Sequence, residues 1–326
     1  MPRLSVGFIG AGGIARSHTK ALKTLGNTDF VAFCDIVKER ALSYCQEYGG
    51  NAYTDFRKMI NEEEMDAVYI CLPPFAHSNE VNIAAENGIH VFIQKPIALN
   101  MDLAEEMVSA VDRAGVKSQV GYQLRFGTGI QRARELLQSA DLGPVTLCLG
   151  RYLCNFLGGS WWRQLSKSGG QIVEQSTHVV DLLRYLCGDI EKVYSEMDTL
   201  YWDEVEDMEI EDVSSTTMKF ESGAIGSMVA TTGGYPGRWI ADLKIFTKKA
   251  VFDLPDPHTL ILTGNEEKEK RFGHTTDLSL AEASHFTQAI LEDTDTCTPI
   301  SDGAKTLEAT LSIRRSGEEG RPVTLG

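Results

Sequence analysis

The chain has 326 residues, 42% hydrophobic and 24% charged, and this length predicts two domains with real hydrophobic cores. A formal net charge of −15 argues against nucleic acid as a partner, because phosphate binding needs clustered Lys and Arg. No apolar run approaches a membrane span. The first expected strand begins within four residues of Met1, so we expect no signal peptide. The seven cysteines contain no C-x-x-C pair, so we expect a reduced, cytoplasmic protein.

A glycine-rich turn follows the first apolar run. Residues 4–10 are typical of a buried parallel strand and lead into GAGGIA at 10–15, a G-x-G-x-x-A pattern before a helical stretch to about residue 25. In such a pattern Gly10 permits the tight turn, Gly12 lets the backbone approach a pyrophosphate, and Ala15 allows close helix–strand contact. The N-terminus of the helix offers free N–H groups to phosphates, so this turn predicts a dinucleotide site.

Asp35 ends the second apolar run, residues 30–34. An acid at this strand tip binds the ribose hydroxyls of NAD and repels the 2′-phosphate of NADP. No arginine follows at once, since residues 36–38 are Ile, Val and Lys, and a single lysine is not a phosphate clamp. Asp35 could also cap a helix over 37–48, and the two roles can coexist. We therefore expect NAD, with NADP the weaker cofactor.

Strands and helices continue to alternate through the first part of the chain. Strands are expected at 67–72, 90–93 and 118–121, with helices at 77–87 and 101–114. This alternation predicts a doubly wound parallel sheet, in which ligands bind at the carboxyl ends of the strands. The residues expected to line the dinucleotide site are Gly10, Gly12, Gly13, Ile14, Asp35, Cys71, Leu72, Pro73, His77, Gln94 and Lys95.

After residue 121 the pattern changes to strands that follow strands. Helices are expected at 128–139 and 174–186, and strands at 144–154, 193–201, 214–220, 224–232, 239–247 and 251–254, with a hairpin turn at 221–223. We expect a first domain over 1–121 and, over 122–326, an α+β domain with a large, mostly antiparallel sheet. The acidic run 203–212 is most simply a solvated loop.

One face of this second sheet lacks an obvious cover. The helices that follow it are too few for both faces, and apolar positions alternate along its strands at Met218, Phe220, Ile225 and Met228. A second copy of the chain would bury such a face, so we expect a homodimer or homotetramer joined through the sheet. The alternative is a monomer whose outer sheet face is polar.

Residues 169–181 read GGQIVEQSTHVVD. Glu174 and His178 are four residues apart, which would put both on one face of a helix, and the preceding glycine pair allows a sharp, close-packed start. Both side chains can transfer protons, so the pair is a candidate for an active site. The alternative interpretation is an amphipathic helix with a structural histidine. Lys95 lies between Gln94 and Pro96 at a strand end and is a further candidate for an active-site residue.

Together these motifs resemble the glucose–fructose oxidoreductase / inositol dehydrogenase / MocA family along nearly the whole chain. The shared residues are the glycine turn, Asp35, CLPPFAH at 71–77, Lys95-Pro96 and the glycine pair with His178 and Asp181. The resemblance implies a Rossmann domain followed by an open-faced sheet that is often buried in dimers or tetramers. It also implies oxidation of a sugar or cyclitol hydroxyl with NAD(P), or the reverse reaction.

The chain departs from the family pattern at two positions. Gln94 stands where the family usually has Glu, which removes a charge beside Lys95, and a cis Lys95-Pro96 turn could persist. Glu174 stands where Asp is common, which keeps the carboxylate but lengthens its side chain.

The reaction that the resemblance implies needs a base and a group that stabilises the reacting oxygen. His178 is the expected acid–base group, Lys95 the expected partner of the oxygen, and Glu174 would position the substrate or the histidine. The expected pocket residues are Tyr122, Arg125, Trp162, Arg163, Glu174 and Tyr235, whereas Asp181 is expected to orient its helix. No metal is expected.

Two other functions stay open. One is cleavage of a glycoside by transient oxidation with bound NAD, which would use the same Lys95 and His178. The other is a dinucleotide-sensing regulator, although a sensor needs neither residue.

Overall fold

The computed structural model describes residues 2–139, 141–264 and 270–326. It divides into two compact units, one of Met1–Tyr122 with Asp277–Ala304 and one of Gln123–Thr276 with Lys305–Gly326. The sequence division at 121/122 assigned all later residues to the second domain, whereas Asp277–Ala304 packs with the first unit.

The first unit is built on a six-stranded parallel sheet with the order β3-β2-β1-β4-β5-β6. Its strands are β1 (Leu4–Ile9), β2 (Thr28–Cys34), β3 (Asn51–Tyr53), β4 (Ala67–Ile70), β5 (His90–Ile93) and β6 (Ser118–Val120). β1, β4 and β5 are buried almost throughout because helices cover a parallel sheet on both faces. The strand order reverses between β1 and β4, which is the switch point where such sheets bind ligands.

The helices of this unit start and stop at recognisable signals. They are α1 (Gly13–Leu25), α2 (Lys38–Tyr48), α3 (Phe56–Glu62), α4 (Glu80–Glu86), α5 (Met101–Ala114) and α11 (Leu278–Leu291), with a 3₁₀ turn, η1 (Pro74–Ala76). α1 ends where Gly26 takes a left-handed φ of 71° and its N–H bonds the Leu22 carbonyl. The helix expected from His77 begins only at Glu80, because η1 occupies Pro74–Ala76 and His77 is extended.

The second unit is built on a nine-stranded sheet with the order β14-β13-β12-β11-β7-β10-β9-β8-β15. Its strands are β7 (Val145–Cys154), β8 (Ile190–Asp198), β9 (Val213–Phe220), β10 (Ile225–Thr231), β11 (Trp239–Thr247), β12 (Ala250–Asp256), β13 (Thr259–Gly264), β14 (Lys270–Phe272) and β15 (Val323–Thr324). Neighbouring strands are antiparallel except for the parallel pair β7 and β10. The turn expected at 221–223 joins β9 to β10, with Gly223 at a φ of 85°. The expected fold class is confirmed in both sheets.

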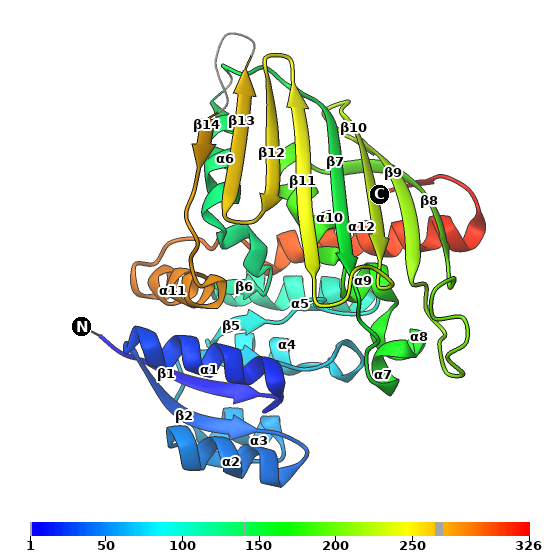
Figure 1. Ribbon diagram of the computed structural model, residues 1–326. Coiled ribbons are helices and arrows are strands. Elements are labelled where there is room, and N and C mark those ends of the chain that lie inside the picture. Colours follow the sequence, from blue (N-terminus) through cyan, green and yellow to red (C-terminus); the bar gives the residue numbers. More distant parts are fainter. Residues whose placement is uncertain (1, 140, 265–269) are drawn as a thin grey trace. The chain divides into compact units, whose positions relative to one another are not determined.

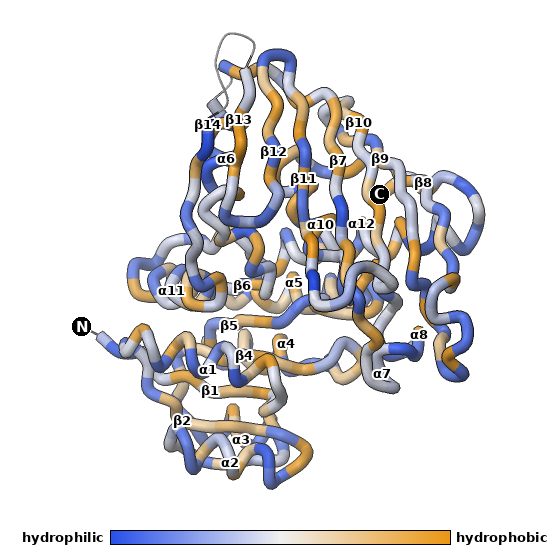
Figure 2. The backbone as a smooth tube through the Cα atoms, viewed as in Figure 1, coloured by the Kyte–Doolittle hydropathy of each residue, from blue (hydrophilic) through white to orange (hydrophobic). Residues whose placement is uncertain are grey.

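Helices of the second unit cover one face of this sheet (Figure 1). They include α6 (Thr128–Gln138), α10 (Thr177–Cys187) and the part of α12 (Ile300–Glu319) from residue 305 onward, with η2 (Gln123–Phe126) and the short α7 (Ser160–Arg163), α8 (Leu165–Ser168) and α9 (Gln171–Glu174). Their apolar side chains share one core with the sheet. Hydrophobic and hydrophilic residues alternate along the strands, as a sheet with one covered face requires (Figure 2).

The alternating residues named from the sequence do not share one face. Met218, Phe220 and Met228 are buried in the core beneath the helices, whereas Ile225 is 54% exposed on the opposite face. Of these four residues, only Ile225 lies on the face that the helices leave uncovered. Sequence alternation identifies the two faces of a strand but does not say which face the helices cover.

The acidic run 203–212 is a loop, but its last residues are not solvated. Asp212 is fully buried, and its carboxylate accepts backbone N–H groups of Leu200, Tyr201 and Trp202 at 2.6–2.9 Å. Glu211 is also buried and forms an ion pair with Arg314. The solvated-loop expectation thus fails at the end of the run, where carboxylates replace missing backbone acceptors.

Candidate active site

The glycine turn after β1 has the shape of a phosphate cradle. Gly10 has a φ of 92°, and a Cβ built there would lie 2.4 Å from the Cys71 carbonyl oxygen, so only glycine fits. Gly12 caps α1, and a Cβ at Gly12 or Gly13 would meet nothing within 4 Å, which leaves room for a ligand beside the backbone. The free N–H groups of α1 begin at this point, and Ile14 is 42% exposed beside them. These residues fit the pyrophosphate of a dinucleotide.

Asp35 follows β2 and holds the glycine turn from the side. Its Oδ2 accepts the N–H of Ala11 at 2.9 Å, and its Oδ1 accepts the N–H of Val37 at 2.8 Å. Val37, two positions after Asp35, is the N-cap residue of α2, and Asp35 bonds the N–H of Val37 rather than an N–H of the first helical turn. The expectation that Asp35 caps this helix is therefore wrong. A carboxylate fixed at the strand tip is suited to accept hydrogen bonds from ribose hydroxyls.

The segment after β4 contributes mainly backbone to this part of the unit. Cys71 is buried, and its N–H bonds the Ile9 carbonyl at 2.7 Å, while Leu72 and Pro73 are half-buried. His77 has a fully buried side chain whose Nδ1 lies 2.6 Å from Oε1 of Glu80. A buried ion pair or hydrogen bond of this kind orders the loop, and sequence reasoning missed Glu80 as the partner of His77.

Gln94 and Lys95 follow β5, and the Lys95–Pro96 peptide is cis. Gln94 is buried against Gly121, and its Nε2 donates to Nε2 of His18 at 2.5 Å. Burial lowers the pKa of His18 to about 4, so this imidazole is neutral near pH 7. The glutamine thus makes an uncharged pair beside the half-buried Lys95.

In the second unit, the glycine pair separates the short helices α8 and α9. Gly169 ends α8 at a φ of 78°, and Gly170 follows at 96°, where a Cβ would lie 2.3 Å from Nη1 of Arg314. The expected close-packed start is confirmed. The single helix over 174–186 is wrong, because α9 ends at Glu174 and α10 begins at Thr177. Glu174 and His178 therefore lie on two helices, not on one helical face.

Aromatic side chains hold the segment between these helices. Oε2 of Glu174 accepts the indole N–H of Trp162 at 2.8 Å, and Oε1 of Gln175 accepts the hydroxyl of Tyr152 at 2.7 Å. Glu174 is 9% exposed and Trp162 2% exposed, so Trp162 supports the carboxylate from beneath rather than presenting its ring to solvent. His178, in the first turn of α10, is half-buried.

The other expected pocket residues differ in their surroundings. Arg163 donates to Asp207 at 2.7 Å, whereas Tyr235 is 65% exposed. Tyr122 is buried. Arg125 is also buried, and its guanidinium makes two hydrogen bonds to Asp181, at 2.7 and 2.5 Å. These bonds pair the guanidinium of Arg125 with the carboxylate of Asp181 on α10. The pocket role of Arg125 stays a prediction.

Sequence reasoning missed Tyr152 and Gln175 as partners in this segment. Tyr152 reads as one more apolar strand residue, and its hydroxyl gives no pattern along the chain. Gln175 directly follows Glu174, so adjacency was the one available signal.

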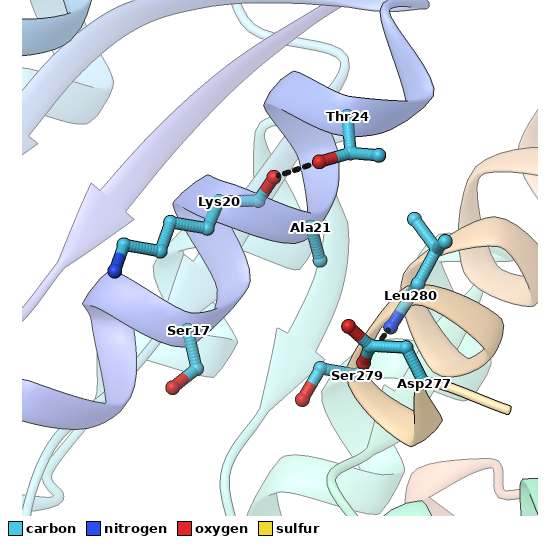
Figure 3. A pocket seen from close by; sticks show the side chains of 7 residues that line it. All are labelled: Ser17, Lys20, Ala21, Thr24, Asp277, Ser279 and Leu280. Carbon is cyan, nitrogen blue, oxygen red and sulfur yellow. Dashed lines mark hydrogen bonds between the residues drawn. The ribbon is translucent and has the colours of Figure 1, made fainter. Parts of the chain in front are cut away.

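A depression of about 230 Å³ lies between α1 and α11 and is lined by Ser17, Lys20 and Thr24 opposite Asp277, Ser279 and Leu280 (Figure 3). None of the expected site residues lines it. Within residues 2–139, 141–264 and 270–326 there is no group of His, Cys, Asp and Glu suited to a metal ion. Over the same ranges, no helix has both the length and the apolarity to cross a bilayer.

Comparison with known proteins assigns both halves of the chain. Residues 4–122 match the family model "Oxidoreductase family, NAD-binding Rossmann fold", and residues 130–252 match the "GFO/IDH/MocA C-terminal domain". The first unit is accordingly an NAD-binding Rossmann domain. The expectation that this domain binds NAD is confirmed by the family match.

Among curated relatives, scyllo-inositol 2-dehydrogenase (NAD(+)) of Bacillus subtilis is 26% identical over 97% of this chain and 95% of its own. An uncharacterized oxidoreductase of the same organism, YrbE, is 26% identical over 68% of this chain and 65% of its own length, somewhat less than two thirds. A solved levoglucosan dehydrogenase, in complex with NADH and L-sorbose, has a TM-score of 0.91 over all of both chains at 20% identity, a likeness of fold. With its two halves matched by the two family domains, the chain belongs to the Gfo/Idh/MocA family of oxidoreductases.

Proposed function

We propose that this protein oxidises a ring hydroxyl of a sugar or cyclitol with NAD, or reduces the corresponding ketone. The observation that carries the proposal is the fixed carboxylate of Glu174 beside the first turn of α10, where His178 lies, in a chain whose other unit is an NAD-binding domain. Relatives named as scyllo-inositol and levoglucosan dehydrogenases support a cyclic polyol as substrate.

The cofactor would be held by the first unit. The N–H groups at the start of α1 and the open backbone at Gly12 suit its pyrophosphate, and Asp35 suits its ribose. When bound, NAD supplies the hydride acceptor. The remaining work is proton transfer and charge stabilisation, which fall to side chains of this chain.

Three side chains have chemistry that suits these tasks. His178 would take the hydroxyl proton, since an imidazole exchanges protons near neutral pH. Lys95 would donate to the reacting oxygen and stabilise its developing negative charge. Glu174 would accept a hydrogen bond from a neighbouring substrate hydroxyl, because the indole N–H of Trp162 holds its carboxylate in one orientation.

Substitution of the two proton-handling residues tests the proposal. We expect Lys95→Ala and His178→Ala each to lower turnover by roughly two to four orders of magnitude, measured as NADH formation on a panel of sugars, cyclitols and glycosides. NADH binding should survive both changes, because the pyrophosphate cradle is distant in sequence and made of backbone. Lys58→Ala, on the exposed surface of α3, is the matched control. Turnover within several-fold of the wild type in either variant would show that the assigned role is wrong.

The same assay separates the other two functions. A dehydrogenase releases NADH in proportion to product, whereas transient oxidation during glycoside cleavage returns the cofactor to NAD and yields none. A sensor would bind the dinucleotide and form no product with any member of the panel.

A further inference from the structure

Four aromatic side chains gather where β7 ends and β11 begins. The ring of Phe156 lies 5.3 Å from that of Trp162 and 5.6 Å from that of Trp239, measured between centroids. Tyr152 meets Trp239 edge-on at 6.1 Å. Trp162 and Tyr152 are almost completely buried, whereas Trp239 is 54% exposed. The inner rings thus support one large indole that presents about half of its surface.

Strand register places this indole on the site's side of the sheet. Trp239 pairs with Cys154, so its side chain shares a face with Tyr152 and with the buried Leu243 two positions further along that face. That face carries the core beneath α10. Trp239 is the first residue of β11, which explains why a ring on the covered face is still exposed.

A ring contact and a hydrogen bond link the indole to the segment that bears Glu174. Trp239 packs edge-on against Tyr152, whose hydroxyl donates to Oε1 of Gln175 at 2.7 Å. Gln175 follows Glu174, whose Oε2 accepts from Trp162 at 2.8 Å. A chain of contacts therefore runs from Glu174 through Trp162, Phe156, Trp239 and Tyr152 back to Gln175. Such a chain holds the exposed ring in one orientation.

We propose that Trp239 is the stacking platform for the ring of a neutral pyranose or cyclitol, whose hydroxyl edge is then turned toward Glu174 and Gln175. A cyclic polyol has an apolar C–H face and a polar rim, and an aromatic plane beside fixed polar groups matches both. The charges favour a neutral ligand over a phosphorylated one, because Glu174 is a carboxylate and Arg163 is bound by Asp207. This inference rests on the proposed function and narrows its substrate class.

The test compares Trp239→Ala with Trp239→Phe on the neutral pyranoside or cyclitol that the wild type turns over best. We expect Trp239→Ala to raise KM about tenfold and to leave kcat within about threefold, since a lost stacking surface weakens binding without removing a proton-transferring group. Trp239→Phe should restore most of the affinity. Tyr194→Ala, which removes a half-exposed ring from β8, is the matched control and should change neither constant. Thermal melting of each variant verifies that the fold is kept.

Direct binding separates this inference from the proposed function. Saturation-transfer NMR with methyl glucopyranosides and inositols at millimolar concentration reports contact between ring protons and protein without turnover. Binding that Trp239→Ala abolishes, in a protein that forms no NADH, would support the platform and contradict the dehydrogenase. A KM within twofold of the wild type in Trp239→Ala would overturn the platform, as would a panel in which no sugar or cyclitol binds in a Trp239-dependent way.

Discussion

Asp35 has two tasks that cannot be changed independently. Its carboxylate holds the N–H groups of Ala11 and Val37, so it shapes the glycine turn as well as the place where an adenosine ribose would bind. The neighbouring Ile36 is 91% exposed and carries no packing role. A substitution that aims at cofactor preference must therefore keep one hydrogen-bond acceptor at 35 and can add charge freely at 36.

We expect the wild type to prefer NAD over NADP, and Asp35→Ser combined with Ile36→Arg to shift the preference toward NADP. Serine removes the charge that repels a 2′-phosphate but keeps an acceptor for the turn, and arginine supplies a partner for the phosphate. The measurement is kcat/KM with each cofactor. Ile36→Arg alone is the control and should still prefer NAD, because Asp35 is intact. Equal or better use of NADP by the wild type would contradict the role given to Asp35.

Local sequence motifs were sufficient to predict the structural roles of residues that depend on backbone geometry. Gly10 could be assigned from its motif because no other residue fits a left-handed turn pressed against Cys71. The ion pair of Arg125 could not be predicted, because its partner Asp181 is 56 residues away and no sequence motif links the two. Long-range partners of polar side chains are set by tertiary packing, which a single sequence does not display.

At the scale of elements, apolar runs predicted the long strands well and the junctions poorly. β11 was expected with its observed limits, because its apolar residues are flanked by turn signals. The break between α9 and α10 was missed, since Gln175 and Ser176 are not helix breakers. In the structure the Gln175 side chain accepts a hydrogen bond from Tyr152, a long-range contact that the local sequence does not indicate. The short β3 and the late helix α11 were also missed.

The position of α11 along the chain does not indicate the unit with which it packs. It lies late in the chain but packs with the first unit, where Phe286 meets Tyr69 and Phe92 edge-on. It also brings Glu282 into the core. This carboxyl group is fully buried, its Oε1 has no hydrogen-bond partner among the residues that the structure describes, and burial raises its pKa well above the ordinary value.

We expect Glu282→Gln to increase the free energy of unfolding by about 1–3 kcal/mol near pH 8 and to change it little near pH 4. The pKa of Glu282 is higher in the folded protein than the value of about 4.3 in an unfolded chain. The folded state therefore holds its proton, and the stability of the wild type declines as the pH rises from the unfolded pKa toward the folded one. Glutamine cannot ionise and removes this decline.

Urea unfolding at several pH values measures the effect. Glu106→Gln, an exposed acid on α5, is the control and should leave the pH dependence as in the wild type. A Glu282→Gln profile parallel to the wild-type profile would mean that Glu282 does not hold its proton in the folded state.

At the scale of the whole molecule, one face of the nine-stranded sheet combines apolar and paired charged residues. In the part of the chain that the structure describes, α6, α10 and α12 lie on the other face (Figure 1). On the uncovered face, the adjacent strands β7 and β10 carry four apolar residues that are 37–54% exposed: Leu147, Leu149, Ile225 and Val229. Ion pairs between Arg151 and Asp242 and between Lys244 and Asp253 flank them. A group of exposed apolar residues flanked by paired charges is typical of a surface that a partner covers.

We propose that this face joins two copies of the chain, as a dimer or within a tetramer, and expect light scattering at micromolar concentration to give at least twice the chain mass of 35.9 kDa. Leu149→Glu with Val229→Glu should shift the mass toward 35.9 kDa, because a twofold interface would bury both introduced charges in each copy. Leu200→Glu, an exposed position on the loop after β8, is the control and should leave the assembly intact. A wild type that is monomeric at this concentration would rule out the sheet as a stable interface. A double variant that keeps the full mass would instead place the interface on another surface, since two buried carboxylates at the centre of the patch could not be accommodated there without loss of binding.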